Sequence, residues 1–299
     1  MSTLLDLFDQ KFRPVVLRGK KPKTVIDYRA AIRSFGNFLG RDATVDDLDD
    51  VTVSAFLDDY AQSGVSPRTV NNKMCYIRRF WDWLAKKRFV EEFPELMRLT
   101  EAQPMPKAWT ADELKQLFDA IAKEDLPVGK YPGPLWWRTL HLFLLETGAR
   151  IGETLAVRWD HYHEESGVLN VPAEIRKGGF KRATYTLRDH VRIPLKWMRT
   201  IDPDAELMFG QGWTASTLYN RYDRVLMRSG LPIIRQNKFH KCRRTYATLI
   251  ELAGMDATAA LMHTSRRTTE NSYLDESQLA AVRKVYHVPL PAVISGGVV

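Results

Sequence analysis

Cysteine is scarce in this chain of 299 residues, which contains only Cys75 and Cys242. Two scattered thiols do not make the disulfide framework of a small secreted protein, so we expect a reducing compartment. The best apolar stretch, residues 140–145, is too short to span a bilayer and contains a histidine. The first residues, MSTLLDLFDQKF, carry acids and form no cleavable signal pattern. We therefore expect a cytoplasmic protein, in the cytosol or at the nucleoid.

Clustered carboxylates at the spacing of metal ligands are also lacking, and the nearby pair His161 and His163 is best interpreted as incidental. We therefore predict no metal and no other cofactor. Internal repeats and low-complexity tracts are missing as well. What remains is an ordinary globular composition, with 44% apolar residues and a length sufficient for two domains.

Positive charge is abundant, since the formal net charge is +8 and the sequence pI is about 9.4. This balance favours a polyanionic partner, and nucleic acid is the leading candidate. On charge alone, a merely basic enzyme is an equal alternative.

The first hundred residues read as helical. Apolar residues at helical spacing begin near Lys23, and Gly40 closes that helix. A short acidic helix around residues 51–60 is expected to begin at Thr44. Ser66 then caps a long helix with proline at its first position. Beside the apolar stripe of this last helix runs a row of cations that we predict to face DNA, with a solvated helix face as the alternative; it includes Arg68, Lys73, Arg78 and Arg79.

Residues 101–108 contain two prolines and little to bury, so they are predicted to link a domain of residues 1–100 to one of residues 109–299. In the second domain, Thr110 caps a helix and Gly148 ends another, over residues 135–146.

Further helices are expected over residues 214–229, 239–252 and 276–285, and a hairpin over 168–171 and 183–187. The helix of residues 214–229 carries Arg221 and Arg224 as further candidate DNA contacts. The predicted fold class is mainly α with a small antiparallel β-sheet in the second domain.

Six scattered residues of the second half carry the chemistry of a phosphodiester site: Arg150, Lys177, His240, Arg243, His263 and Tyr273. Guanidinium groups bind two phosphate oxygens at once and stay protonated, and losing one such donor costs about 3–4 kcal/mol of transition-state stabilisation. The two arginines would therefore bind the phosphate that the tyrosine attacks. Taken singly, each residue is better explained as a surface, ion-pair or packing residue.

Tyrosine has a pKa of about 10 and needs a base to attack. His240 is the candidate for accepting its proton, and His263 for donating a hydrogen bond to the phosphate. Lys177, at the hairpin tip, would protonate the leaving alkoxide, with Lys181 as its rival. Two neighbours receive structural interpretations: Glu153 orients Arg150 or caps a helix, and Cys242 faces inward.

The segments TGARIGETLAVRW, HKCRRTYATL and the stretch from His263 to Tyr273 together resemble the tyrosine recombinase, or phage integrase, family. In the amino half, SPRTVNNKMCYIRRFWDWL is similar to the last long helix of the core-binding domain of that family. The resemblance covers roughly residues 5–273. It implies a helical, SAM-like core-binding domain followed by a catalytic domain with a C-terminal tail.

For the chemistry, the resemblance implies a site-specific recombinase, acting in DNA integration, excision or resolution. Tyr273 would form a covalent 3′-phosphotyrosyl link, with Tyr286 as a weaker rival nucleophile. Arg150 and Arg243 would bind the phosphate, Lys177 would be the general acid, His240 the base, and His263 the second histidine.

The partners implied are double-stranded DNA, a homotetramer on paired DNA sites and accessory DNA-bending proteins. Two alternatives stay open: a catalytically silent DNA-binding protein and a tyrosine-type topoisomerase. The sequence does not reveal the target site, or whether the gene belongs to a virus, plasmid, transposon or chromosome.

Overall fold

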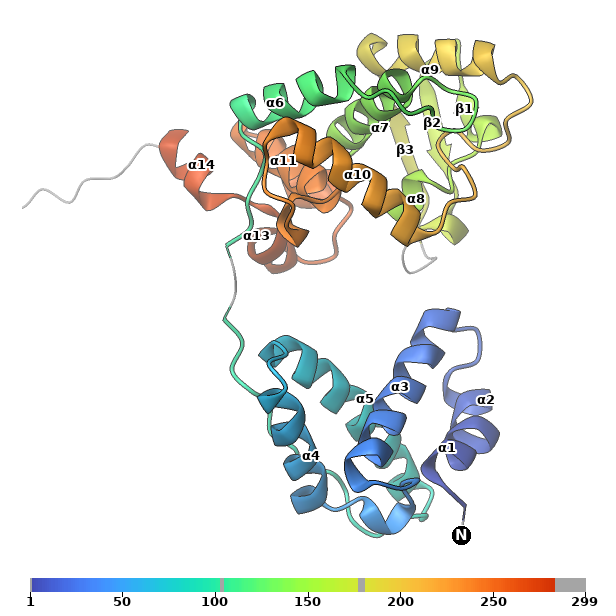
Figure 1. Cartoon of the computed structure of the whole chain (residues 1–299), viewed down its shortest axis with the longest axis vertical. Helices are drawn as coiled ribbons and strands as arrows, with labels where there is room; N and C mark the ends of the chain where they lie inside the picture. The colour runs from blue at the N-terminus through green and yellow to red at the C-terminus, as the bar shows by residue number, and fades with distance from the viewer. Residues whose placement is uncertain (1, 103–104, 177–180, 283–299) are drawn as a thin grey trace, which may run out of the picture. The chain divides into compact units, whose positions relative to one another are not determined.

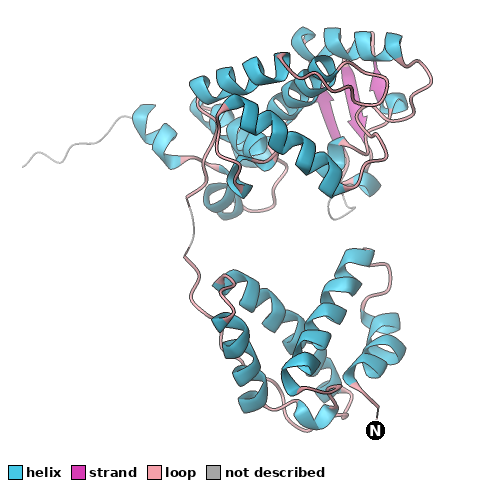
Figure 2. Ribbon diagram, viewed as in Figure 1, coloured by secondary structure: helices cyan, strands magenta, loops and turns pink. Residues whose placement is uncertain are grey.

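A computed structural model describes residues 2–102, 105–176 and 181–282 of the chain. The chain divides into two compact units, Met1–Gln103 and Pro104–Val299, and each unit has a hydrophobic core of its own (Figure 1). Helices dominate both units, and the strands described lie in the second (Figure 2). The predicted fold class, mainly α with a small antiparallel sheet, is confirmed.

The regular elements described in unit 1 are all helical. Its elements are α1 (Leu4–Leu7), the π-helical turn η1 (Phe8–Phe12), α2 (Arg13–Val16), α3 (Pro22–Leu39), the 3-10 turn η2 (Val45–Asp47), α4 (Asp50–Gln62) and α5 (Pro67–Lys86).

Local signals set the ends of the long helices of unit 1. Gly40 ends α3 in the left-handed conformation, at φ 69°, where an L side chain would be strained. The Ser66 hydroxyl accepts the Thr69 amide at 3.3 Å and caps α5. One expectation was wrong: Thr44 caps only the turn η2, and α4 begins separately with Asp49 as its cap.

Unit 2 contains the helices and the sheet around which the candidate site is built. Its elements are α6 (Ala111–Ala122), α7 (Gly133–Thr147), α8 (Ile151–Thr154), the 3-10 turn η3 (Trp159–His161), β1 (Tyr162–His163), β2 (Val168–Val171), the 3-10 turn η4 (Ala173–Ile175), β3 (Ala183–Thr186), α9 (Asp189–Ile201), α10 (Ala215–Ser229), the 3-10 turn η5 (Arg235–Asn237), α11 (His240–Leu252), α12 (Ala257–Ala260), α13 (Arg266–Tyr273) and α14 (Glu276–Val282).

The sheet of unit 2 is antiparallel with the order β1-β2-β3. In the predicted hairpin, Val168 pairs with Thr186 and Val171 pairs with Ala183. The short strand β1, which the sequence did not indicate, adds to the other edge of β2.

Helix α7 is the buried centre of unit 2 and packs against α6, α9 and α11. Its side chains Trp136, Trp137 and Phe143 are fully buried in the main core. Burial of a large apolar side chain stabilises the folded state by about 1.5–3 kcal/mol, so this packing holds α7 and α11 in fixed register. The loop after α7 and the first turn of α11 carry part of the candidate site.

The predicted linker, residues 101–108, does not remain free of packing along its whole length. Pro106 and Ala108 are buried, and the Ala108 amide donates a hydrogen bond to Asp275 Oδ2 at 2.9 Å. The last linker residues thus belong physically to unit 2.

Candidate active site

The turn that carries Arg150 depends on a glycine. Gly148 follows α7 at φ 61°, and a Cβ on this residue would lie only 2.3 Å from the Tyr246 ring. The turn places Arg150 at the N-cap of α8, where its Nη1 donates to Glu153 Oε1 at 3.1 Å. Glu153 also accepts the Arg150 backbone amide, so it both caps α8 and orients the guanidinium, as the sequence predicted.

Arg243 lies in the first turn of α11 and is only 2% exposed. Its Nη1 donates to the Gly148 carbonyl and its Nη2 donates to the Leu261 carbonyl at 3.2 Å. Nη2 also contacts His263 Nε2 at 2.9 Å. One guanidinium therefore joins the turn after α7 to the loop after α12.

His263 has both ring nitrogens engaged. A guanidinium can only donate, so Nε2 accepts from Arg243, and Nδ1 must carry the proton that Thr269 Oγ1 accepts at 2.9 Å. Burial, together with the charges of Arg243 and Arg150, lowers the pKa of His263 to about 4. The ring is therefore neutral near pH 7, and in this arrangement it holds Arg243 in place.

Tyr273 ends α13 and lies inside the same cluster, with its side chain 7% exposed. Its ring centroid is 5.1 Å from that of His240 and 4.7 Å from that of His263. The Arg243 Cζ lies 5.2 Å from the same centroid. Four of the six predicted residues thus converge in space from α11, the loop before α13, and α13 itself.

The positive charges of Arg150 and Arg243 repel each other. Burial lowers the pKa of Arg243, and the positive charge of Arg150 lowers it further, while Tyr273 and Glu153 act in the opposite direction. Two like charges held close together form a natural anion site, because a bound phosphate would relieve their repulsion. His240, at the exposed first residue of α11, lies beside the tyrosine ring.

The predicted general acid, Lys177, lies outside the described residues, as does the rival nucleophile Tyr286. Lys181, the rival acid, is described and exposed. Its carbonyl accepts Arg176 Nη1 at 3.0 Å, and the same Nη1 contacts Met262 Sδ at 3.3 Å. Arg176 thereby connects the base of the hairpin to the residue before His263.

Sequence reasoning missed Arg176 and Thr269 as parts of this site. Arg176 is 7% exposed although it is an arginine beside a predicted hairpin tip, and no sequence signal distinguishes it from its basic neighbours. Thr269 could have been suspected because it lies six residues after His263, in the helix that leads to Tyr273.

The cations of α5 predicted to face DNA have different environments. Arg68, Arg78 and Arg79 are exposed. Lys73 instead packs inside unit 1: its Nζ donates to Ser34 Oγ at 2.7 Å and lies 4.0 Å from the Tyr60 ring centroid. Burial lowers the pKa of Lys73, so this lysine is a structural contact between α3, α4 and α5.

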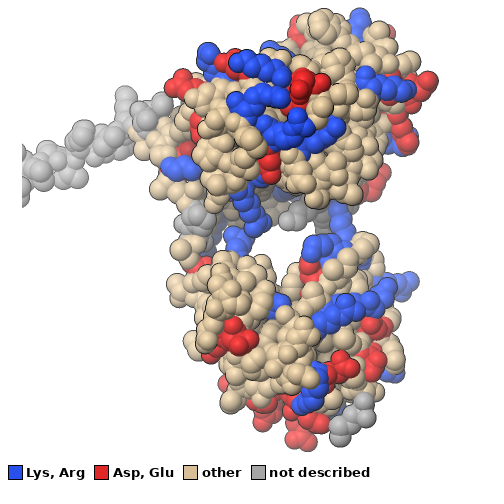
Figure 3. Space-filling model, viewed as in Figure 1, with Lys and Arg blue, Asp and Glu red and all other residues tan. Residues whose placement is uncertain are grey.

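Arg221 and Arg224 of α10 interact with the loop that follows α6. Arg221 Nη1 donates to the Pro127 carbonyl at 2.8 Å, and its Cζ lies 4.5 Å from the Trp213 ring centroid. Arg224 lies 3.9 Å from Asp125. In Figure 3, blue side chains gather over α10 with red ones among them, so the positive charge of this face is partly compensated.

The interior of unit 2 also tests the structural interpretation of Cys242. Cys242 is fully buried beside Arg243, and burial raises the pKa of its thiol to about 12, so it faces inward as the sequence predicted.

Across the described ranges, no three His, Cys, Asp or Glu side chains gather in a way that could hold a metal ion. Within the same ranges, no helix is both long and apolar enough to cross a membrane.

Two family models match the chain. The model of the Phage integrase family covers residues 107–279, and the model of the N-terminal SAM-like domain of phage integrases covers residues 4–91.

Two curated relatives are similar to most of this chain. Tyrosine recombinase XerC of Xanthomonas campestris pv. campestris (strain B100) is 25% identical over 251 residues, which are 80% of this chain and 74% of the relative. The integrase of Escherichia phage lambda is 24% identical over 215 residues, which are 72% of this chain and 56% of the relative.

Solved structures resemble the whole fold. A lambda integrase dimer bound to a COC′ core site has a TM-score of 0.72 and 20% identity, covering 97% of this chain and all of that one. The XerH site-specific recombinase bound to a palindromic difH substrate, a post-cleavage complex, has a TM-score of 0.68 and 21% identity, covering 94% of this chain and 84% of that one. At these identities the likeness establishes the fold.

Proposed function

The chain belongs to the phage integrase family, and we propose that it is a site-specific DNA recombinase that cleaves and rejoins DNA strands through Tyr273. The observation that carries this proposal is the packing of the Tyr273 ring against Arg243, His240 and His263 within one unit. A phenol held beside a buried guanidinium and two imidazoles has the groups that in-line attack on a phosphodiester requires.

In the proposed step, the Tyr273 oxygen attacks the scissile phosphorus and the bond from phosphorus to the 5′ oxygen breaks. His240 accepts the phenol proton, and a lysine proton goes to the departing 5′ oxygen. Arg150 and Arg243 bind the non-bridging oxygens, where negative charge accumulates. The product is a 3′-phosphotyrosyl ester and a free 5′-hydroxyl, and attack by a 5′-hydroxyl from a second duplex reverses the step and exchanges strands.

The burial of Arg243 supports its role because a charge in a water-poor site acts on the transition state with less screening. The neutral, doubly bonded His263 supports a role in orienting that guanidinium. Its predicted donation of a hydrogen bond to the phosphate from Nε2 would require the ring to release Arg243 and to carry its proton on Nε2 instead of Nδ1.

We propose Lys177 as the general acid, with Lys181 as the alternative in the same predicted hairpin. Loss of a general acid typically slows a reaction about 10²–10⁴-fold. Replacing each lysine by alanine separately assigns the role, because only the acid slows cleavage by this amount while DNA binding persists.

The partner is proposed to be double-stranded DNA, bound in part by the exposed Arg68, Arg78 and Arg79 of α5. Assembly as a homotetramer on paired sites is supported by the lambda integrase tetramer bound to a Holliday junction, which has a TM-score of 0.68 to this chain. Accessory DNA-bending proteins and residence at the nucleoid complete the proposal.

The decisive experiment uses a nicked suicide duplex, with its sequence chosen by searching the DNA on both sides of the gene for repeats. The unaltered protein should form a covalent adduct that resists denaturant, and Tyr273→Phe should bind the duplex but form none. Tyr286→Phe is the matched control and should behave as wild type. An adduct formed by Tyr273→Phe would remove Tyr273 from the reaction.

The same substrate separates the alternatives. A catalytically silent DNA-binding protein gives a shifted duplex without an adduct. A topoisomerase forms the adduct on one duplex but never joins strands between two duplexes, whereas a recombinase does.

A further inference from the structure

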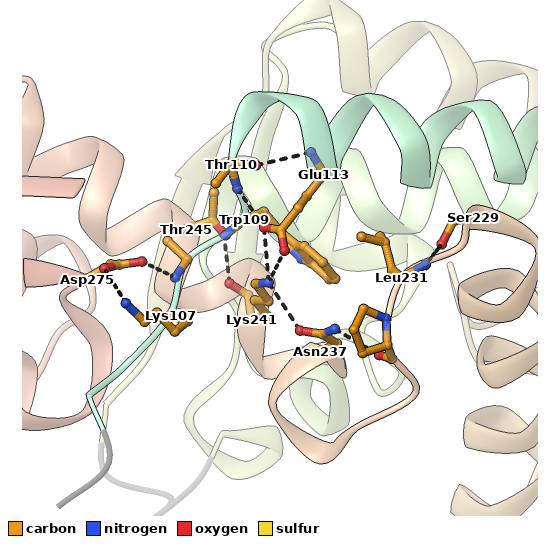
Figure 4. A network of polar contacts seen from close by, with 12 residues as sticks. Lys107, Trp109, Thr110, Glu113, Ser229, Leu231, Asn237, Lys241, Thr245 and Asp275 are labelled. Carbon is orange, nitrogen blue, oxygen red and sulfur yellow. Dashed lines mark hydrogen bonds and ion pairs between the residues drawn. The ribbon is translucent and has the colours of Figure 1, made fainter. Parts of the chain in front are cut away.

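Asp275 lies two residues after Tyr273, and its side chain is only 2% exposed. The proposed chemistry does not use it. Figure 4 shows its carboxylate facing the segment of residues 107–109, where the chain begins to pack into unit 2. A buried carboxylate is costly unless its oxygens are hydrogen-bonded, so its partners indicate what it does.

The partners of the two Asp275 oxygens come from two parts of the chain, residues 107–108 and the start of α14. Oδ2 accepts the Ala108 amide at 2.9 Å and Gln278 Nε2 at 3.4 Å. Oδ1 accepts the Ser277 amide at 3.1 Å, in the first turn of α14, and it also accepts the Ser277 hydroxyl. Lys107 Nζ lies 3.9 Å from Oδ1 and donates to Ser277 Oγ at 2.9 Å.

These donors keep Asp275 ionised. Burial alone would raise the pKa of this carboxyl, but the hydrogen bonds from Ser277 and the Ala108 amide, together with the charge of Lys107, bring the pKa below its ordinary value.

The backbone between Tyr273 and Asp275 is also fastened to α11. Thr248 of that helix is fully buried; its hydroxyl donates to the Tyr273 carbonyl at 3.5 Å and accepts the Asp275 amide at 3.1 Å. Leu274, between them, is fully buried in a small core with Ala247 and Leu261. The residue that follows the nucleophile therefore has little freedom.

The segment that Asp275 binds is itself attached to α11. The Trp109 amide donates to Thr245 Oγ1 at 2.8 Å, and the Trp109 ring centroid lies 3.7 Å from Lys241 Nζ. That ammonium, buried at 3% exposure, also donates to Glu113 Oε1 at 3.0 Å and to Asn237 Oδ1 at 3.1 Å (Figure 4). Lys241 is the residue after His240, so the same network supports the helix turn that carries the base and Arg243.

We propose that Asp275 is a positioning residue for the nucleophile: by binding Ala108 and Ser277 it fixes the backbone after Tyr273 against α11, and so holds the Tyr273 oxygen beside Arg243. This inference rests on the proposed function of Tyr273. Misplacement of a reacting atom by about 1 Å can cost about 10²-fold in rate. The network thus makes the beginning of unit 2 part of the geometry of the reaction.

Asp275→Asn tests this proposal with little change in size. Asparagine has one side-chain oxygen and one amino group, so it cannot accept from both Ala108 and Ser277, and one side must present N–H to N–H. With the nicked suicide duplex at saturation, single-turnover cleavage should be about 10–100-fold slower. The dissociation constant for the duplex should stay within about 2-fold of wild type, as expected for a side chain that is only 2% exposed.

A second substrate, with sulfur in place of the 5′ bridging oxygen, separates positioning from proton transfer. A thiolate leaves without protonation because a thiol has a far lower pKa than an alcohol. Asp275→Asn should cleave both substrates more slowly by the same factor, because the substitution displaces the nucleophile and leaves protonation of the leaving group unchanged. Alanine at the general-acid lysine should recover on the sulfur substrate.

Asp49→Asn is the matched control, since Asp49 is a helix N-cap of unit 1 that accepts the Thr52 amide at 2.8 Å. It should cleave both substrates at the wild-type rate. Cleavage by Asp275→Asn at the wild-type rate would overturn the proposal, and so would recovery on sulfur. Weaker DNA binding and a lower Tm with unchanged cleavage at saturation would also overturn it and leave a purely structural role.

Should Asp275→Asn fail to fold, Ser277→Ala removes one donor to Oδ1 and keeps the carboxylate. It should slow both substrates equally, by about 2–10-fold, and a wild-type rate would again overturn the proposal. If the unaltered protein forms no adduct, the function of Tyr273 itself is refuted. An adduct with wild type and a normal rate with Asp275→Asn refutes the positioning role alone.

Discussion

Replacing Arg243 by lysine keeps the charge and removes the planar fork. Arg243 donates to the Gly148 carbonyl, the Leu261 carbonyl and His263 Nε2, which lie around one guanidinium. The single ammonium of a lysine retains one of these partners, so two hydrogen bonds from a charged donor are lost. At about 1.5 kcal/mol each, the net loss is about 3 kcal/mol of folding stability.

For a unit of the size of Pro104–Val299, 1 kcal/mol moves Tm by about 2–4 °C, so Arg243→Lys should lower the Tm of unit 2 by about 6–12 °C. Cleavage of the suicide duplex, measured below the lowered Tm, should fall about 10²–10³-fold because the bidentate phosphate contact is gone. Calorimetry and single-turnover adduct formation measure the two effects.

Arg221→Lys is the matched control in the same unit. Arg221 donates one hydrogen bond to the Pro127 carbonyl and lies over Trp213, contacts that a lysine can largely replace. Its Tm should change by less than about 4 °C, corresponding to about 1 kcal/mol. A Tm for Arg243→Lys within 2 °C of wild type would refute the reasoning that this guanidinium holds the two loops together.

Two further predictions concern the same site. Gly148→Ala should lower the free energy of unfolding by about 2–5 kcal/mol, since φ is 61° and the added Cβ would meet the Tyr246 ring at 2.3 Å. Gly230→Ala, at φ 73° with nothing within 4 Å of its Cβ, should cost only about 1–2 kcal/mol; equal losses in calorimetry would contradict this account. Because the pKa of His263 is about 4 when folded and ordinarily 6.5, the unfolded chain binds the extra proton between these values, so stability falls as the pH decreases from 6.5 towards 4. His263→Gln should show a smaller decrease in Tm from pH 7 to pH 5 than wild type, although His141, with the same lowered pKa, still contributes; an identical decrease would count against the assignment.

The sequence predicted helix ends and strands correctly where neighbouring residues alone determine them. Gly40 and Gly148 lie in the left-handed conformation that ends a helix, and Ser66 and Thr110 cap the helices that follow them. The strands of the hairpin were placed almost to the residue because alternating apolar residues define one buried face. The predicted start of the acidic helix at Thr44 was wrong. Two capping residues, Thr44 and Asp49, follow each other closely, and the sequence does not say which of them begins the long helix.

In the candidate site, too, the sequence predicted the local features and left the contacts between distant segments undecided. The sequence alone determined the residue types, because a phosphodiester reaction needs guanidinium, imidazole, ammonium and phenol groups, and their local motifs are continuous in the chain. The roles assigned to them stay predictions, and Lys177 lies outside the described residues. Lys73, which shares the helix spacing of its basic neighbours, turned out to be packed against Ser34 and Tyr60.

Only the tertiary structure decided which polar groups are hydrogen-bonded to each other. It placed the proton of His263 on Nδ1 by giving Nε2 to Arg243, and it brought Asp275 to the Ala108 amide across 167 residues of sequence. Such contacts depend on where separate helices dock. Periodicity and capping describe one segment at a time, whereas the partner of a buried polar group is set by the packing of all the segments around it.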